Sequence, residues 1–265
     1  MKEVWCFAAP DKMKIVFHEN FLETYTSDPA ASYGRLEPAL ELVTDRFPMV
    51  TPAPCSVEDV LRVHTSFHLE DVQRDSRVYP MAMLAAGATI NAADLAMKGE
   101  PAFALCRPPG HHASPDSCWG FCYFNNIAVA TSRLLETGQA DHVLIIDFDL
   151  HFGDGTSNIF SGESRVTFWH VSGRNNTSFV QNLEDYLEGK KADIVAVSAG
   201  FDRHANDWGG MLTTEDYGAM GEILGRFARE NCGNRIFAAL EGGYNARSLG
   251  NSVLAFTEGI ERTTS

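Results

Sequence analysis

The chain has 265 residues, of which 45% are hydrophobic; this is enough for one large core and does not require a second domain. Its formal net charge of −14 argues against a nucleic-acid partner, because binding to phosphates needs a basic face. The charge mildly favours cationic substrates or basic partners, although a solubilising acidic surface is the simpler explanation. No apolar run approaches the length of a membrane span and no signal-peptide pattern opens the chain, so we expect a cytosolic protein without membrane contact.

The predicted elements alternate between strands and helices along the chain. A capping-box pattern at Ser56 marks one helix start, and Gly99 and Gly138 mark two helix ends. This alternation predicts a single domain over 1–265 with a three-layer α/β/α architecture and a mainly parallel sheet. In chain order we expect a strand at 13–17, helices at 33–47, 56–64 and 81–98, a strand at 102–106, a helix at 125–137, strands at 143–146 and 166–171, a helix at 179–187, a strand at 194–197, a helix at 213–231, a strand at 236–240 and a helix at 247–262.

The cysteines form no Cys-x-x-Cys pair and stand mostly beside apolar residues, as reduced buried thiols do. We therefore expect no disulfide among them. The six are Cys6, Cys55, Cys106, Cys118, Cys122 and Cys232.

Residues capable of metal binding or acid/base chemistry follow four of the predicted buried strands. In an open α/β sheet the carboxyl ends of the strands share one edge, where ligands bind. Segments that are far apart in sequence can therefore meet there. These segments are 107–112, 147–154, 198–202 and 241–244.

Asp149, His151 and Asp202 form the candidate metal site. Residues two apart at a strand end point to the same side, so Asp149 and His151 can hold one ion together. Asp202 can supply a third ligand from another strand and leave an open position for water, as on a catalytic zinc ion. An Asp-x-His pair alone is usually an ordinary loop feature. Here the two adjacent histidines, a third aspartate and a Gly-Gly-Tyr segment at other strand ends make a metal site the better interpretation.

His111 and His112 follow a Pro-Pro-Gly stretch that presents both rings at a strand end. Paired imidazoles suit proton transfer near neutral pH when carboxylates orient them, and Asp147 and Asp154 are the available carboxylates. The alternative is that one histidine only makes a hydrogen bond in the core.

Tyr244 follows two glycines, which let the chain turn sharply and place the phenol in a cleft. Beside a metal ion, its hydroxyl can donate a hydrogen bond to a carbonyl oxygen that becomes an oxyanion. Taken alone, Gly-Gly-Tyr is more often a turn with a packing aromatic ring.

Together these motifs resemble the zinc-dependent histone deacetylase and acetylpolyamine amidohydrolase family, in a short bacterial-type form. The resemblance covers most of the chain. Weaker matches at 33–37 and 63–64 precede the others in the family's usual order. The main motifs are Arg107-Pro108-Pro109-Gly110-His111-His112-Ala113, Gly120-Phe121-Cys122-Tyr123-Phe124-Asn125-Asn126, Asp147-Phe148-Asp149-Leu150-His151-Phe152-Gly153-Asp154-Gly155-Thr156, Ser198-Ala199-Gly200-Phe201-Asp202 and Glu241-Gly242-Gly243-Tyr244.

The resemblance implies an arginase/deacetylase-like fold and a role for each matched residue. His112, hydrogen-bonded to Asp154, would be the main general base and acid. His111, hydrogen-bonded to Asp147, would bind the zinc-bound water and take part in proton transfer. Some family members carry histidine in place of the tyrosine and act poorly on acetyl-lysine, so the tyrosine favours deacetylase activity. The remaining implied roles are zinc binding by Asp149, His151 and Asp202, carbonyl polarisation by Tyr244, lining of the acyl-lysine tunnel by Gly120 and Phe121, and a place near an internal acetate channel for Arg35.

The family also binds potassium beside the zinc ion. The resemblance assigns this second site to Asp147, Asp149 and His151 with backbone carbonyls near His170 and Val171. The expected activity is hydrolysis of an acetyl or related acyl group from an amine, such as acetyl-lysine or an acetylated polyamine.

Three departures from the family pattern bear on the substrate. Phe152 stands where the family usually has a second histidine, so we expect altered packing near the site. The loop at 172–178 is short, and no clear counterpart exists for the aspartate that grips a peptide substrate, with Asp71 and Asp75 as candidates. A reduced rim favours small acylated amines or exposed acetyl-lysine side chains. Alternatively, a neighbouring copy of the chain completes the rim; the sequence does not give the oligomeric state.

Two other functions stay open. A ureohydrolase-like enzyme with two manganese ions would use similar aspartate-rich strand ends, but would need more ligands and would be better served by His111 and His112 as ligands. A non-catalytic protein that binds acyl-lysine would be expected to have lost a zinc ligand or Tyr244.

Overall fold

The computed structural model describes residues 13–264, and within this range the strands form one parallel sheet. Its order is β2-β1-β3-β7-β6-β4-β5, and every neighbouring pair is parallel. The predicted parallel sheet is therefore confirmed. The strands are β1 (Lys14–Val16), β2 (Met49–Val50), β3 (Ala102–Ala104), β4 (Val143–Asp147), β5 (Val166–His170), β6 (Ile194–Ala199) and β7 (Ile236–Leu240).

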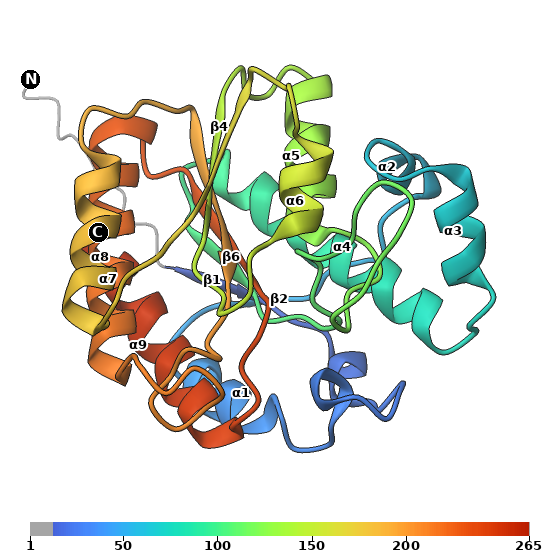
Figure 1. Cartoon of the computed structure of the whole chain (residues 1–265), viewed down its shortest axis with the longest axis horizontal. Coiled ribbons are helices and arrows are strands. Elements are labelled where there is room, and N and C mark those ends of the chain that lie inside the picture. Colours follow the sequence, from blue (N-terminus) through green and yellow to red (C-terminus); the bar gives the residue numbers. More distant parts are fainter. Residues whose placement is uncertain (1–12, 265) are drawn as a thin grey trace, which may run out of the picture.

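Helices cover both faces of the sheet, which confirms the three-layer arrangement. In Figure 1, α1, α7, α8 and α9 lie on one side of the strands and α4, α5 and α6 on the other. Short 3₁₀ turns occur at Glu19–Leu22 and Pro29–Ala31. The α-helices are α1 (Glu37–Thr44), α2 (Val57–Leu61), α3 (Ser66–Gln73), α4 (Val78–Ala96), α5 (Asn126–Glu136), α6 (Asp154–Ile159), α7 (Asn176–Leu187), α8 (Thr214–Cys232) and α9 (Ala246–Thr264).

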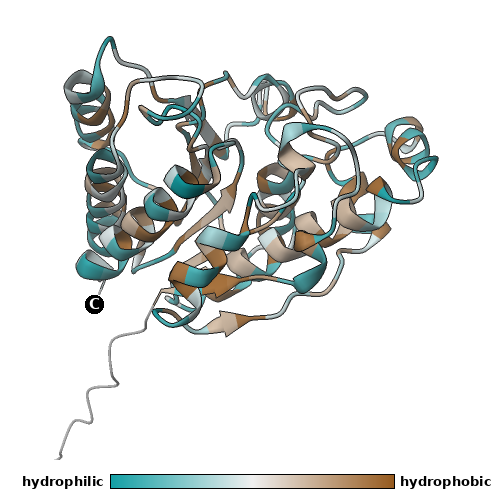
Figure 2. Cartoon of the chain, turned by 90° about the horizontal axis from the view of Figure 1, so that it is seen from below, coloured by the Kyte–Doolittle hydropathy of each residue, from teal (hydrophilic) through white to brown (hydrophobic). Residues whose placement is uncertain are grey.

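The central strands are buried along their whole length, as expected for a parallel sheet with helices on both faces. Their residues are mostly branched or small and apolar, and they pack in one hydrophobic core with the inner faces of the helices. Figure 2 shows hydrophobic residues along the strands and hydrophilic residues on the outer turns of the helices. This core holds the carboxyl ends of β3, β7, β6 and β4 side by side.

Most predicted helices are present, with shifted ends. The capping box at Ser56 is formed, and Thr213 caps α8 in the same way. The helix predicted at 33–47 was wrong at its start: α1 begins at Glu37 because Pro38 is tolerated only in a first turn. The sequence interpretation missed β2, α3 and α6, which are too short to show a clear hydrophobic period.

The five cysteines within residues 13–264 are free thiols, and Cys6 lies outside the described residues. Within the same range, no helix combines the length and the apolar character needed to cross a bilayer.

Candidate active site

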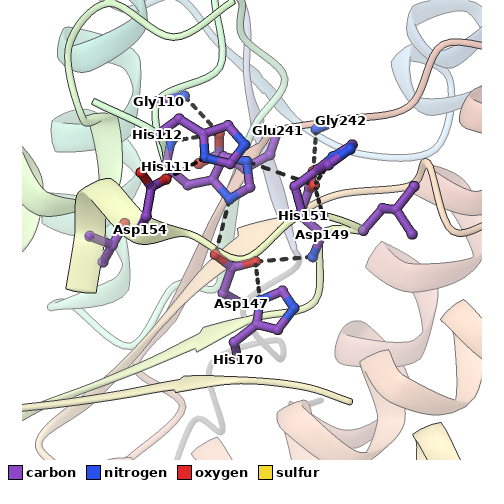
Figure 3. Close-up of polar contacts among 12 residues, drawn as sticks. Gly110, His111, His112, Asp147, Asp149, His151, Asp154, His170, Glu241 and Gly242 are labelled. Carbon is purple, nitrogen blue, oxygen red and sulfur yellow. Dashed lines mark hydrogen bonds and ion pairs between the residues drawn. The ribbon is translucent and has the colours of Figure 1, made fainter. Parts of the chain in front are cut away.

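The four motif segments meet at one edge of the sheet, where β3, β7, β6 and β4 end next to one another. Figure 3 shows that His111, Asp147, Asp149 and Glu241, which lie at or after the ends of β3, β4 and β7, are close together at this edge. The structure therefore brings together the residues that the sequence interpretation had expected to converge.

Asp149, His151 and Asp202 offer ligand atoms that all lie within 4.8 Å of one another. His151 Nδ1 is 3.5 Å from an Asp149 oxygen and 3.4 Å from Asp202 Oδ2. Asp202 Oδ2 is buried and accepts no hydrogen bond from residues 13–264. A Cβ on Gly242 would lie 2.5 Å from Asp149 Oδ2 and 2.7 Å from Asp202 Oδ2, so the backbone is packed directly against both carboxylates. Two carboxylates and an imidazole in this arrangement fit a divalent ion.

The charges of this cluster also favour a cation. Burial and the neighbouring Asp149 carboxylate raise the pKa of Asp202 to about 6. The adjacent Asp149 and Asp202 carboxylates favour the protonated imidazole and raise the pKa of His151 to about 9. Two buried carboxylates this close repel each other, and a bound divalent ion would relieve that repulsion and displace the His151 proton.

A second group of residues, His111, Cys122 and Glu241, has ligand atoms equally close together. Its chemistry fits a metal ion less well. Burial, together with the Glu241 charge, raises the pKa of the Cys122 thiol well above its usual value, which disfavours the thiolate that binds metals. Glu241 Oε2 already accepts the backbone N–H groups of Gly110 (2.6 Å) and His111 (3.1 Å). Glu241 therefore fixes the loop that carries the histidines, a contact that the sequence interpretation did not identify.

Each of the two adjacent histidines is paired with the carboxylate expected for it. His111 Nδ1 lies 3.1 Å from Asp147 Oδ2, and His112 Nδ1 lies 2.6 Å from Asp154 Oδ1 (Figure 3). Donation from Nδ1 leaves Nε2 of His112 free for substrate or water, whereas Nε2 of His111 lies 3.7 Å from Asp149 Oδ1. Trp119 Nε1 donates to the other oxygen of Asp154 at 2.9 Å, so this carboxylate is held from two sides.

The environments of the two rings shift their pKa values in opposite directions. Burial and the neighbouring His111 lower the pKa of His112 to about 4, so His112 is neutral at pH 7 and can accept a proton. Burial opposes the charged form of His111, but the Asp149 and Asp147 carboxylates outweigh it and raise the pKa of His111 well above its usual value. A divalent ion at Asp149 would weaken that attraction and lower the pKa of His111.

Tyr244 is placed by contacts that the sequence interpretation missed. Its backbone N–H donates to Asp207 Oδ2 at 2.7 Å, and its ring stacks on Trp208 with ring centres 4.0 Å apart. Phe121 packs edge-on against the ring at 6.0 Å. The Tyr244 hydroxyl forms no hydrogen bond with any of residues 13–264, and Tyr244 lines the cavity, so the hydroxyl can donate to a ligand.

A cavity of about 120 Å³ lies between these groups. Trp119 and Trp208 are half exposed at its mouth. Gly120 lies against His112: a Cβ there would be 2.4 Å from His112 Cδ2, and its φ of 61° is one that side chains rarely adopt. The lining residues are Pro109, His111, His112, Trp119, Gly120, Phe121, His151, Trp208, Gly242 and Tyr244.

Arg35 does not line this cavity. It is buried behind Tyr244, where its guanidinium donates to the carbonyl oxygens of Gly243 and Glu241, both at 2.7 Å. Arg35 therefore supports the Gly-Gly-Tyr segment from inside the fold.

The expected potassium residues lie on the inner side of the metal-ligand loop. Asp147 is fully buried, and its carbonyl oxygen accepts the Val171 N–H at 2.8 Å. His170 Nδ1 is 3.5 Å from Asp147 Oδ1. The carbonyl oxygen of Asp149 accepts a hydrogen bond from Arg203, a residue that the sequence interpretation did not consider.

The residues at which the chain departs from the family pattern lie outside the cavity. Phe152 is half exposed and packs its ring 5.5 Å from His170, outside the cavity lining. Asp71 pairs with the exposed Arg74, and Asp75 accepts backbone N–H groups at the start of α4. Neither aspartate lines the cavity.

The comparisons with known proteins agree with this geometry. A family model described as the histone deacetylase domain matches residues 30–179 and 174–260. The chain belongs to the histone deacetylase family. A "probable deacetylase" from Archaeoglobus fulgidus is 30% identical, with 87% of this chain and 81% of the relative covered. A "histone deacetylase-like amidohydrolase" from Pseudomonas aeruginosa is 28% identical, with 80% of this chain and 70% of the relative covered.

A solved structure supports the fold assignment. The structure titled as the HDA15 HD domain superposes with a TM-score of 0.82 at 25% sequence identity. The match covers 95% of this chain and 89% of that chain. The arginase/deacetylase-like α/β fold expected from the sequence is thus confirmed.

Proposed function

We propose that the chain is a zinc-dependent deacetylase that hydrolyses an acyl amide of an amine, such as acetyl-lysine or an acetylated polyamine. The observation that carries the proposal is the shared cavity: His151 of the metal cluster, both paired histidines and Tyr244 all line it. Amide hydrolysis needs an activated water, a base, an oxyanion donor and an acid, and each has a candidate here.

Asp149, His151 and Asp202 would hold the zinc ion. When bound, it would act as a Lewis acid toward the amide carbonyl and lower the pKa of a water molecule. The chain itself supplies the proton transfers and the orientation of the substrate.

His112 is the proposed general base. Its lowered pKa keeps Nε2 unprotonated at neutral pH, and its Nδ1 is held by Asp154. Once His112 has accepted a proton from the attacking water, the Asp154 carboxylate stabilises the imidazolium. This imidazolium, assisted by His111, then protonates the amine as it leaves.

Tyr244 is the proposed oxyanion donor. Burial raises the pKa of its phenol far above the usual value, so the hydroxyl remains protonated and able to donate. Its clamped backbone and stacked ring keep that hydroxyl in place before the substrate binds, which is the arrangement that stabilises an oxyanion most effectively.

The narrow cavity and its aromatic mouth favour a slim acylated alkylamine. The half-exposed rings of Trp119 and Trp208 flank the entrance, and a cationic group beyond the acyl-amine bond would meet aromatic faces and an acidic protein. This supports small acylated amines or exposed acetyl-lysine side chains as substrates.

The test is acetate release from an acetyl-lysine peptide and from acetylputrescine, measured with metal-stripped and zinc-restored protein. We expect turnover of at least one substrate only after zinc is restored. Asp202→Asn should lose both zinc and activity, while the exposed Asp71→Asn should retain both. Turnover by the metal-stripped protein would rule out the proposal.

The alternatives give different results in the same experiment. A ureohydrolase-like enzyme would bind two ions per chain and leave both acetylated substrates intact. A binding protein would hold zinc and an acetylated ligand without releasing acetate.

A further inference from the structure

Arg203 directly follows the metal-ligand candidate Asp202 and folds back onto the loop that carries the other two ligands. Its Nε donates to the carbonyl oxygen of Asp149 at 3.1 Å, and one Nη donates to the carbonyl oxygen of Leu150 at 3.1 Å. The same Nη lies 3.2 Å from His170 Nε2. The guanidinium therefore bridges the loop and the end of β5.

The surroundings of Arg203 hold it in this place. Its carbonyl oxygen accepts the N–H groups of Met211 (3.0 Å) and Leu212 (2.9 Å), and its guanidinium lies over the Phe179 ring at 4.9 Å. Both ends of the residue are thus fixed, and the side chain is only partly exposed.

The charge of this region explains why a fixed cation belongs there. Asp147, Asp149 and Asp202 are each at most 1% exposed. Buried carboxylates are costly unless positive charge compensates them. A divalent ion at the ligand cluster would compensate part of this negative charge. The Arg203 guanidinium adds a fixed positive charge that interacts with Asp149, Asp202 and, more weakly, Asp147.

The potassium site that the family resemblance implies does not fit this arrangement. Asp149 is one of the residues assigned to that ion, and its carbonyl oxygen already accepts a hydrogen bond from Arg203. The same guanidinium also contacts the Leu150 carbonyl oxygen and the His170 ring, so it occupies the side of the loop that faces β5. A potassium ion placed beside a guanidinium in a buried region would also be repelled by it. We infer that Arg203 is a built-in cation that replaces potassium, so that the metal-ligand loop is ordered and charge-balanced without a monovalent ion.

The experiment compares potassium chloride with tetramethylammonium chloride at equal ionic strength, because tetramethylammonium is too large for a carbonyl-lined site. The readouts are the melting temperature and acetate release. The wild-type protein should melt at the same temperature in both salts and keep its activity within about twofold. The melting measurement does not depend on deacetylase activity, so it tests the inference even if the proposed function fails.

Arg203→Met removes the charge and keeps an apolar stem of similar length. This variant should be less stable than wild type in tetramethylammonium, and potassium should raise its melting temperature by roughly 4 °C as the freed carbonyls bind the ion. Arg203→Lys keeps a positive charge and should stay indifferent to potassium. The matched control is Arg226→Ala, which removes an exposed charge on α8 that pairs with Glu184 on α7, and it should also stay indifferent.

Two results would overturn the inference. The first is a wild-type protein whose melting temperature rises by several degrees with potassium, since a built-in cation would make the ion redundant. The second is an Arg203→Met variant as stable as wild type in both salts. If Arg203→Met does not fold in either salt, the wild-type and Arg203→Lys responses decide between the two interpretations.

Discussion

Tyr244→Phe tests the proposed oxyanion donor most cleanly, because the structure predicts that only one hydroxyl function is lost. The backbone N–H held by Asp207 and the ring stacked on Trp208 are both retained by phenylalanine. Removing one donor to an oxyanion typically lowers kcat by about 10²–10³-fold, equivalent to roughly 2.7–4 kcal/mol of transition-state stabilisation. Since the hydroxyl forms no hydrogen bond with residues 13–264, the free energy of unfolding should change by less than about 0.5 kcal/mol.

The assay is steady-state acetate release with kcat and KM determined separately, together with zinc content and the melting temperature. A fall in kcat with KM, zinc content and melting temperature unchanged is the expected result, because the hydrogen bond strengthens only as the oxyanion forms. Tyr186→Phe is the matched control: this ring stacks on Trp169, away from the cavity, and its variant should keep full activity. A Tyr244→Phe enzyme within threefold of wild-type kcat would refute the role assigned to the hydroxyl.

Three further predictions follow from the site. His112→Ala should lower kcat by at least about 10²-fold with zinc retained, because the base is lost and the ligands are not; normal turnover would show that another group is the base. Zinc affinity should rise about tenfold per pH unit up to about pH 9, because the ion must displace the proton that the raised pKa of His151 holds on the ring. Calorimetry in buffers of different ionisation enthalpy should show that close to one proton is released per bound ion near pH 8. Binding without proton release would contradict this prediction. Gly120→Ala should reduce kcat at least about tenfold, because the added Cβ displaces the His112 ring. Gly138 also has a positive φ, but a Cβ there meets no atom within 4 Å, so Gly138→Ala should affect stability alone. Equal activities of the two variants would disprove the steric argument.

The part of the site that could be predicted from sequence is the part that follows buried strands. Asp149, His151 and Asp202 each come within a few residues of a strand end, and the common edge of a parallel sheet then brings them together. The pairing of His112 with Asp154 was predicted from the family resemblance, and the hydrogen bond between them is present.

The contacts that could not be predicted come from loops with no periodic pattern. Trp119, Asp207 and Arg203 lie in such segments, and each acts through a hydrogen bond to a group distant in sequence. The same limit applies to the fold: α6 (Asp154–Ile159) is one short helix inside a motif, with too few residues to show a hydrophobic face. The intrinsic propensities of these residues do not predict where the segments lie. Their positions are determined by how the loops pack against the sheet once it has formed.

The most direct test of the central claim is a titration of metal-stripped protein with zinc, in which bound zinc and acetate release are measured on the same samples. We predict that activity rises in proportion to bound zinc and reaches its maximum at one ion per chain, and that Asp202→Asn neither binds the ion nor gains activity. Full activity before zinc is added, or a maximum reached only at two ions per chain, would contradict the account of a single metal ion held by Asp149, His151 and Asp202.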